Sequence, residues 1–333
     1  MTPPPWIEAQ TRQLLAQRGH AWLLHGPSGL GQYSLAMELA RAWLCEQPGH
    51  NGAPGACGTC GSCHAIDVRT HADLCVLMPE VTMLELGWPL SEKAQAEVDD
   101  KKRKASKEIR VDAMRDAVEF SQRTSARGRG KVVLVFPAEQ MNAITANALL
   151  KTLEEPPGDV KFVLASESAH QLLPTIRSRC LGHAMHWPDA QSSQAWMLSQ
   201  GVAAPQAQLL LKATGGRPED AMAFAGSGRD PSAWSALPKA MARGDTTFFK
   251  DWTVPQTVDA LHKLCHDLMA RQTGATPRFF DTADLVSTAP MSALSAWSKA
   301  LANTMRTMDH PFNAGLMQEA LVGQAKSALN SHH

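Results

Sequence analysis

The sequence predicts an α/β domain followed by a helical C-terminal part. Up to about residue 187, short apolar runs typical of buried strands alternate with helical patterns. A glycine-rich turn joins one of these strands to a helix, and the last third of the chain carries apolar residues at three- and four-residue spacing. A length of 333 residues is enough for two or three domains.

The composition is that of a folded protein with no net charge. Hydrophobic residues make up 44% of the chain and charged residues 19%, which excludes a disordered chain. The formal net charge is zero, so any contact with nucleic acid must come from a local basic patch. There is no apolar run of about 18 residues, and Met1–Pro5 lacks the features of a signal peptide. We therefore expect a cytoplasmic protein that does not contact a membrane.

The glycine-rich turn, residues 26–33, has the spacing of a phosphate-binding loop but lacks its two chemical residues. The pattern is Gly, four residues, Gly, Lys, then Ser or Thr, in which the Lys reaches the phosphates and the hydroxyl holds Mg²⁺. Here Gln32 replaces the Lys and Tyr33 replaces the hydroxyl. The glycines that keep the pattern are Gly26, Gly29 and Gly31. We predict a degenerate loop that does not bind ATP productively, because an amide has no charge and a phenol is too long for the metal position.

The flanking sequence favours a real phosphate-loop remnant. Ala21–His25 is typical of a short buried strand, and Leu35–Cys45 has the apolar spacing of a helix. A strand, a glycine-rich loop and a helix, in that order, are what a phosphate loop requires. An ordinary strand–turn–helix unit is the alternative.

A second site has lost its chemistry as well. Lys131–Phe136 is a strong buried strand, and in a working ATPase acidic residues for Mg²⁺ and the attacking water follow it. Pro137 and Ala138 occupy those positions, and Glu139 falls one residue late. Two independent losses make an inactive ATPase a stronger prediction than either loss alone.

Four cysteines predict a structural zinc site. Cys45, Cys57, Cys60 and Cys63 supply four thiols, and a closed set of four thiolates leaves no open position for catalysis. Unligated cysteines on a loop are the alternative. His64 competes as the fourth ligand if Cys45 is too far away, and His50 and His71 are weaker candidates.

The remaining elements of this half follow from local patterns. We expect a helix at residues 109–122 and another from Thr145 that a proline pair ends at Pro156. Lys161–Ser166 is typical of a buried strand and Leu181–Trp187 of an edge strand. Ser91–Lys107 is highly charged without a period, which predicts a solvated loop, with contact to a DNA backbone as its functional alternative.

Three features together resemble one protein family. Asn147–Pro157, the triplet Ser178-Arg179-Cys180 and the four-cysteine insertion are similar to those of the bacterial DNA polymerase III clamp-loader ATPases. The resemblance covers nearly all of residues 1–230 and weakens beyond them. The degenerate phosphate loop and the missing acidic pair resemble the δ′ type of member rather than the active γ/τ motor type.

This resemblance implies a division into three domains. Residues 1–187 would form an AAA+ core with the zinc module, residues 188–228 a helical lid, and residues 229–333 a helical collar that joins five subunits into a ring. Lid helices are expected at 192–200, 205–213 and 217–225, and collar helices at 255–269, 291–308 and 316–329. Arg217 matches only loosely the arginine with which active relatives sense nucleotide.

The resemblance also implies roles and partners. Arg179, within the motif of Ser178 and Cys180, would reach the ATP bound by a neighbouring motor subunit, for which a permanently charged guanidinium is suited. The alternative is a solvated arginine or a partner of Glu154 or Glu155. The implied partners are γ/τ and δ subunits in a five-membered ring, the sliding clamp, and primer–template DNA through the assembled complex.

A basic cluster is the candidate for DNA contact. Its members are Arg123, Arg127, Arg129 and Lys131, which could bind phosphates without reading sequence. A basic loop is more often simply solvated. The competing functions for the whole chain are an active γ/τ-type ATPase subunit and a zinc-containing DNA-binding module.

Overall fold

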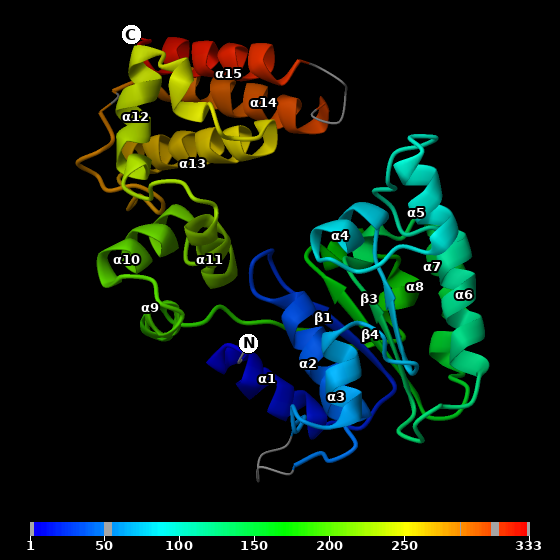
Figure 1. The fold of residues 1–333 in the computed structure, drawn as a ribbon. Coiled ribbons are helices and arrows are strands. Elements are labelled where there is room, and N and C mark those ends of the chain that lie inside the picture. The colour runs from blue at the N-terminus through cyan, green and yellow to red at the C-terminus, as the bar shows by residue number, and fades with distance from the viewer. Residues whose placement is uncertain (1–2, 50–54, 287, 308–312, 332–333) are drawn as a thin grey trace. The chain divides into compact units, whose positions relative to one another are not determined.

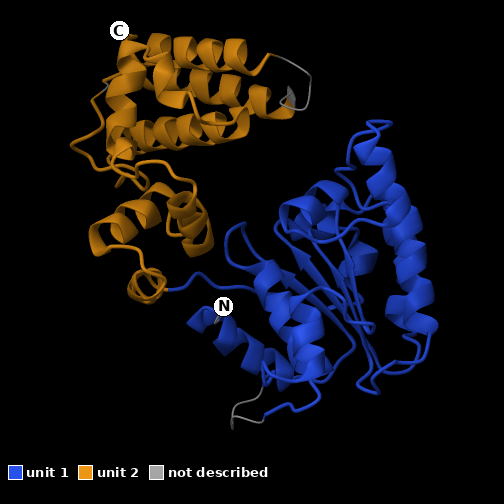
Figure 2. Ribbon diagram, viewed as in Figure 1, with its two compact units in different colours: residues 1–188 blue, residues 189–333 orange. Residues whose placement is uncertain are grey.

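The computed structural model describes residues 3–49, 55–286, 288–307 and 313–331. The chain divides into two compact units, Met1–Pro188 and Asp189–His333, each described by itself (Figure 2). In the described residues, no helix is both long enough and apolar enough to cross a membrane.

The first unit is built on a five-stranded parallel sheet in the order β2-β3-β4-β1-β5 (Figure 1). Its strands are β1 Ala21–His25, β2 Leu74–Leu77, β3 Lys131–Val135, β4 Val160–Ser166 and β5 Leu181–Ala184. The four strands expected from apolar runs are confirmed, with β5 at an edge. No sequence pattern predicts β2, which is only four residues long and lies at the other edge.

Helices cover both faces of this sheet, which explains why its strands are continuously apolar. The helices are α1 Pro5–Leu15, α2 Gln32–Leu44, α3 Gly61–Asp67, α4 Glu80–Glu85, α5 Glu92–Asp99, α6 Val111–Gln122, α7 Ala143–Glu154 and α8 Pro174–Arg177. Val132 packs with residues of α2 and α3, whereas its neighbour Val133 packs with residues of α6 and α7. The predicted α2, α6 and α7 are confirmed, and α1 was not expected.

The prediction of a solvated loop at residues 91–107 is wrong for Glu92–Asp99, which form the helix α5. The Ser91 hydroxyl accepts the N–H of Ala94 and so caps the helix. After the helix, the guanidinium of Arg103 binds Glu97 at 2.7 Å and also Glu80. The helix therefore has a side-chain cap at its start and an ion pair, of Glu97 with Arg103 six residues further on, and neither produces an apolar period.

The second unit is helical and contains two apolar clusters. Its helices are α9 Ala190–Ser199, α10 Ala204–Ala213, α11 Pro218–Gly226, α12 Ala233–Arg243, α13 Val254–Gln272, α14 Met291–Thr307 and α15 Ala314–Leu329. One cluster joins α9 to α11, and a larger one joins α12 to α15, with Phe224 packed against both. The six expected helices are confirmed, and α12, which contains Pro238, was missed. The division into a lid and a collar stays a prediction.

Candidate functional site

The phosphate loop lies between β1 and α2, at the carboxyl end of an interior strand of the sheet. Gly29 and Gly31 have φ angles of 80° and 87°, which strongly favour glycine over residues with a Cβ. The glycine spacing therefore reflects the backbone shape of the loop.

Gln32 is turned back onto the loop. Its side-chain amide donates hydrogen bonds to the carbonyl oxygens of Gly26, at 2.9 Å, and Pro27, at 2.7 Å. The residue is only 2% exposed. Because an amide has two N–H donors and both are used, Gln32 has no donor left for a phosphate.

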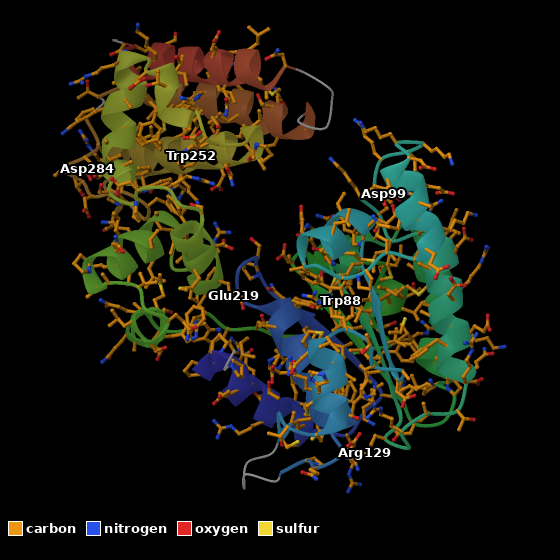
Figure 3. The ribbon with its side chains drawn as sticks, in the orientation of Figure 1. Trp88, Asp99, Arg129, Glu219, Trp252 and Asp284 are labelled. Atoms are coloured by element: carbon orange, nitrogen blue, oxygen red, sulfur yellow. The ribbon has the colours of Figure 1, made fainter. Side chains whose placement is uncertain are left out.

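Tyr33 fills the space next to the loop with aromatic contacts. Its hydroxyl accepts the indole N–H of Trp88 at 2.8 Å, and its ring centroid lies 5.5 Å from that of Phe136 (Trp88 is labelled in Figure 3). Burial raises the pKa of the Tyr33 phenol, which therefore stays neutral. Phe136 directly follows β3, so this ring pair lies between the start of α2 and the end of β3.

The two residues that follow Phe136 at the end of β3 carry no carboxylate. Pro137 and Ala138 stand at the expected acidic positions, and Ala138 is fully buried. One carboxylate oxygen of Glu139 accepts the peptide N–H of Glu167 at 3.0 Å, just beyond β4. Its other oxygen, Oε2, is buried and has no hydrogen-bond partner in the described residues, so only one of the two oxygens links the strand ends.

The four cysteines converge on one point, as predicted. Sγ–Sγ distances are 3.9 Å for Cys45–Cys60 and Cys45–Cys63 and 4.0 Å for Cys57–Cys63, and all four sulfurs lie within 4.8 Å of one another. A tetrahedral zinc ion with Zn–S bonds of about 2.3 Å requires sulfurs about 3.8 Å apart. The donor set and its spacing therefore fit zinc.

Backbone N–H groups aim at these sulfurs. Peptide N–H groups of Cys57 and Cys60 donate to Cys45 at 3.2 Å and to Cys57 at 3.3 Å, and Thr59 donates to Cys57 at 3.5 Å. The hydrogen bonds from Thr59 lower the pKa of Cys57 to about 6, which favours its thiolate. Burial raises the pKa of Cys45 and of Cys63, so a metal would have to displace the protons of these two thiols. The site is positioned by the end of α2, which precedes Cys45, and by the start of α3.

In the described residues, no histidine predicted as an alternative ligand belongs to this cluster. His64 is exposed, and the cluster of four sulfurs does not include it. His71 is buried, and its ring nitrogens contact the Ser62 hydroxyl at 3.1 Å and the peptide N–H of Asp73 at 3.0 Å. His50 lies outside the described residues.

Hydrogen bonds connect the cysteine centre to the segment before β3. Glu46, next to Cys45, accepts the hydroxyl of Ser62 at 2.9 Å and the guanidinium of Arg127 at 2.7 Å. Arg127, followed by Ser62, lowers the pKa of this carboxyl. The cysteine cluster and a basic segment are therefore joined through one carboxylate.

A buried carboxylate, Asp73, binds the same segment. It accepts the peptide N–H groups of Ala126 and Arg127 at 2.8 and 2.9 Å, the Ser125 hydroxyl at 3.0 Å, and the Lys131 ammonium at 3.3 Å. Burial alone would raise the pKa of Asp73, but the N–H groups of Ala126 and Arg127 lower it below its ordinary value. Sequence patterns gave no signal for Asp73, Glu46 or Trp88, because their partners come from distant segments.

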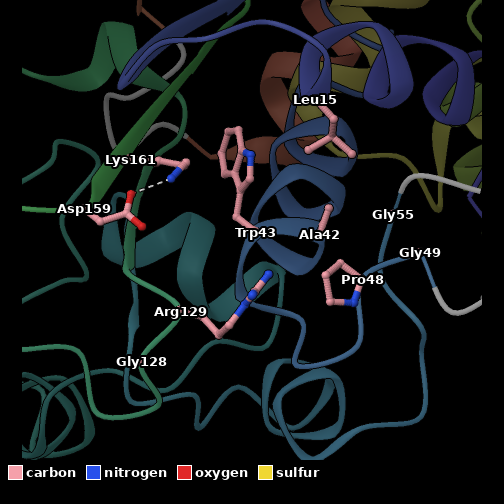
Figure 4. Close-up of a pocket in the computed structure, with 10 residues that line it drawn as sticks. All are labelled: Leu15, Ala42, Trp43, Pro48, Gly49, Gly55, Gly128, Arg129, Asp159 and Lys161. Carbon is pink, nitrogen blue, oxygen red and sulfur yellow. Dashed lines mark hydrogen bonds and ion pairs between the residues drawn. The ribbon is translucent and has the colours of Figure 1, made fainter.

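The predicted DNA-binding cluster is only partly available. Lys131 is 5% exposed and paired with Asp73, so it is withdrawn from the expected contacts. Arg123 pairs with Glu119 at 2.5 Å, and Arg127 with Glu46, although both remain partly exposed. Arg129 lines a hollow of about 500 Å³ together with Trp43 and with Lys161, which pairs with Asp159 at 2.7 Å (Figure 4).

Arg179 lies between α8 and β5 and is 30% exposed. Its Nη2 and Nε atoms lie 2.8 and 3.2 Å from one carboxylate oxygen of Glu154, and its Nη1 donates to the Thr175 carbonyl at 3.0 Å. Of the two partners considered from the sequence, Glu154 is therefore the one observed.

The two residues next to Arg179 carry a hydroxyl with a local hydrogen bond and a partly buried thiol. The Ser178 hydroxyl donates to the Thr175 carbonyl at 3.2 Å. Burial raises the pKa of Cys180 to about 12, so this thiol is not a reactive nucleophile. In the second unit, Arg217 binds Asp220 at 3.0 Å and the Thr214 carbonyl at 2.9 Å.

Known proteins match the chain along much of its length. Residues 8–186 match the family described as DNA polymerase III, delta subunit. The chain is 41% identical over 228 residues to DNA polymerase III subunit delta' of Pseudomonas aeruginosa, covering 67% of this chain and 62% of that protein. It is 35% identical over 228 residues to subunit delta' of Escherichia coli K12, covering 66% and 60%. Subunit tau of Salmonella typhimurium is 33% identical over 162 residues, covering 49% and 21%.

A solved structure shares the fold. A gamma subunit-related protein of DNA polymerase III from Thermotoga maritima superposes with a TM-score of 0.50 at 16% identity, covering 98% of this chain and 100% of that one. Such a low identity speaks for the fold alone, an α/β fold that resembles the AAA+ type. The matched part spans about 60% of the length of the two delta' relatives. Because the family match covers more than half of the chain, the chain belongs to the DNA polymerase III delta subunit family.

Proposed function

We propose that this chain is a δ′-type subunit of a bacterial DNA polymerase III clamp loader. It completes a five-membered ring with γ/τ and δ subunits and helps to load the sliding clamp on primed DNA. In this proposal it does not hydrolyse ATP itself. The observation that carries the proposal is the engagement of Gln32 with the carbonyl oxygens of its own phosphate loop, at 2.9 and 2.7 Å.

Two contacts and one residue identity support the absence of ATP hydrolysis by this chain. The Gln32 donors are used within the loop, Tyr33 packs on Phe136 where a metal-holding hydroxyl would need room, and Ala138 replaces an acid. Phosphoryl transfer depends almost entirely on charges placed around the phosphates and Mg²⁺. A loop without its cation, hydroxyl and acids supplies none of them.

Arg179 gives the chain a role at a neighbour's ATP. A guanidinium remains charged at any physiological pH and donates in a planar fork that matches phosphate oxygens. In GTPases such an arginine, supplied from another chain, accelerates hydrolysis about 10³- to 10⁵-fold. Arg179 is partly exposed and follows α8, and Arg177, two residues earlier, is exposed and serves as its control.

The cysteine centre has a structural role in this proposal. Cys45, Cys57, Cys60 and Cys63 would hold zinc, and the ion would cross-link the end of α2 to α3. Lid and collar functions are assigned to residues 188–228 and 229–333. Primer–template DNA would meet Arg123, Arg127 and Arg129 in the assembled ring, through phosphates.

The test is the DNA-stimulated ATPase rate of a ring reconstituted with γ/τ and δ subunits. We expect Arg179→Ala to assemble normally and to lower this rate by about 10-fold or more, whereas Arg177→Ala keeps it. Equal rates for wild type and Arg179→Ala, in rings of equal composition, would falsify the arginine-finger role and leave the chain as a scaffold.

A further inference from the structure

The surroundings of Arg179 restrict which of its N–H groups can reach a phosphate. Nε and Nη2 both donate to one oxygen of Glu154, and Nη1 donates to the Thr175 carbonyl. A guanidinium has five N–H donors, so two remain, one on each Nη atom. In the described residues, Arg179 contacts no further acceptor. An N–H pair of this kind can hold two phosphate oxygens in a fork.

The stability of α7 does not account for a carboxylate at the position of Glu154. It is the last residue of that helix, where the helix dipole disfavours negative charge. The side chain is 61% exposed, and an ion pair of this exposure contributes little to folding. Its one contact with a charged group in the described part of the chain is with Arg179. A function for Glu154 is therefore to be sought at Arg179.

We propose that Glu154 is the positioning residue of Arg179. Together with the Thr175 carbonyl of α8, it fixes the guanidinium from one side and leaves two N–H groups for the phosphate of a neighbouring subunit. This inference rests on the proposed function. Glu154 itself touches neither ATP nor the attacking water, and it acts only by orienting the guanidinium.

The contact allows a second role with the opposite sign. A carboxylate on a guanidinium could hold it away from the phosphate, so that the pair would have to open before hydrolysis. Positioning predicts that removing the carboxylate slows hydrolysis, whereas restraint predicts that it speeds hydrolysis. The direction of the change therefore separates the two roles.

The experiment compares variants in the reconstituted ring under DNA stimulation. We expect Glu154→Ala to lower kcat about two- to fivefold, the range of an exposed ion pair, with KM for ATP unchanged. Glu154→Gln should keep more activity than Glu154→Ala, because its amide oxygen still accepts hydrogen bonds. The matched control is Glu155→Ala, since Glu155 is also exposed and has no contact with Arg179.

Further measurements make the result decisive. Thermal unfolding of each variant and the composition of each ring should match the wild type, which excludes a folding or assembly defect. Glu154→Ala combined with Arg179→Ala should be no slower than Arg179→Ala alone. A kcat at or above the wild-type value for Glu154→Ala overturns the positioning role even where Arg179→Ala is slow. If Arg179→Ala itself is as fast as wild type, the proposed function fails first.

Discussion

The phosphate loop and the four-cysteine centre lie in the same unit and differ in what their polar atoms contact. In the loop, the Gln32 amide donates to carbonyl oxygens of the loop itself. Tyr33 accepts a hydrogen bond from Trp88 and packs on Phe136. In the cysteine centre, four sulfurs surround one point at tetrahedral spacing. The comparison shows that glycine spacing indicates the backbone shape of a loop. Whether the loop can bind a ligand depends on what its side chains contact.

Removal of the metal tests the cysteine centre and should have the largest effect. Cys63→Ser should abolish binding of about one zinc ion per chain and lower the free energy of unfolding by about 4 kcal/mol or more. For a unit of this size, that corresponds to a fall in Tm of about 8–16 °C. Hydrogen exchange at Ala126 and Arg127 should quicken, because Glu46 links the centre to this segment.

The control for this prediction is Cys180→Ser, which removes a thiol outside the cluster and should leave the zinc content unchanged. A wild-type protein without zinc, or a Cys63→Ser protein with the wild-type Tm, contradicts a structural metal site.

Asp73→Asn extends the test to the buried carboxylate that binds the segment of residues 125–127. Asn keeps the shape but leaves Lys131, 5% exposed, without its counter-charge. Breaking such a buried pair from one side should lower the free energy of unfolding by about 3 kcal/mol, as measured with urea at pH 7. Asp159→Asn, which breaks an exposed pair with Lys161, should cost at most about 1 kcal/mol.

The contribution of Asp73 should also depend on pH. Its pKa is lowered in the folded protein, so its stabilisation is present above the unfolded pKa, about 4, and is lost as pH falls through the folded pKa. The difference in stability between wild type and Asp73→Asn should therefore narrow from pH 6 to pH 3. A difference that stays constant over this range would show that the Asp73 charge is not responsible.

Restoring the two missing residues tests the phosphate loop. Wild type should not bind Mg·ATP at millimolar concentration, whereas Gln32→Lys with Tyr33→Thr should gain affinity about tenfold or more, as measured by calorimetry. Hydrolysis should remain absent because Pro137 and Ala138 supply no carboxylate. Gln32→Lys alone should gain less, since Tyr33 still packs on Phe136. Micromolar binding by the wild type would refute the degenerate-loop interpretation.

The smallest expected effect is at the basic segment that the cysteine centre holds. Arg129→Ala should weaken binding of primer–template DNA by the assembled ring about threefold and reduce its salt slope by about one. Lys299→Ala, on the exposed side of α14, should change neither quantity. Unchanged affinity and slope for Arg129→Ala would place the DNA contact elsewhere.

Sequence patterns predicted the elements with a local signal. β1, β3 and β4 are continuous apolar runs because a parallel sheet buries both faces, and α2, α6 and α7 have helical spacing. The charged sequence of α5 predicts a loop because the features that mark this helix, the Ser91 cap and the ion pair of Glu97 with Arg103, produce no apolar period. The strand β2 was missed because it has only four residues.

The sequence by itself determined the residue types that make or abolish chemistry. The four thiols, the amide and phenol in place of Lys and a hydroxyl, and the position of Arg179 follow from identity and spacing along the chain. Only the tertiary structure decided which atoms these groups contact. Glu154 reaches Arg179 from 25 residues away, and Trp88 reaches Tyr33 from 55 residues away. Such pairs depend on which elements lie side by side, and no local period or spacing encodes that arrangement.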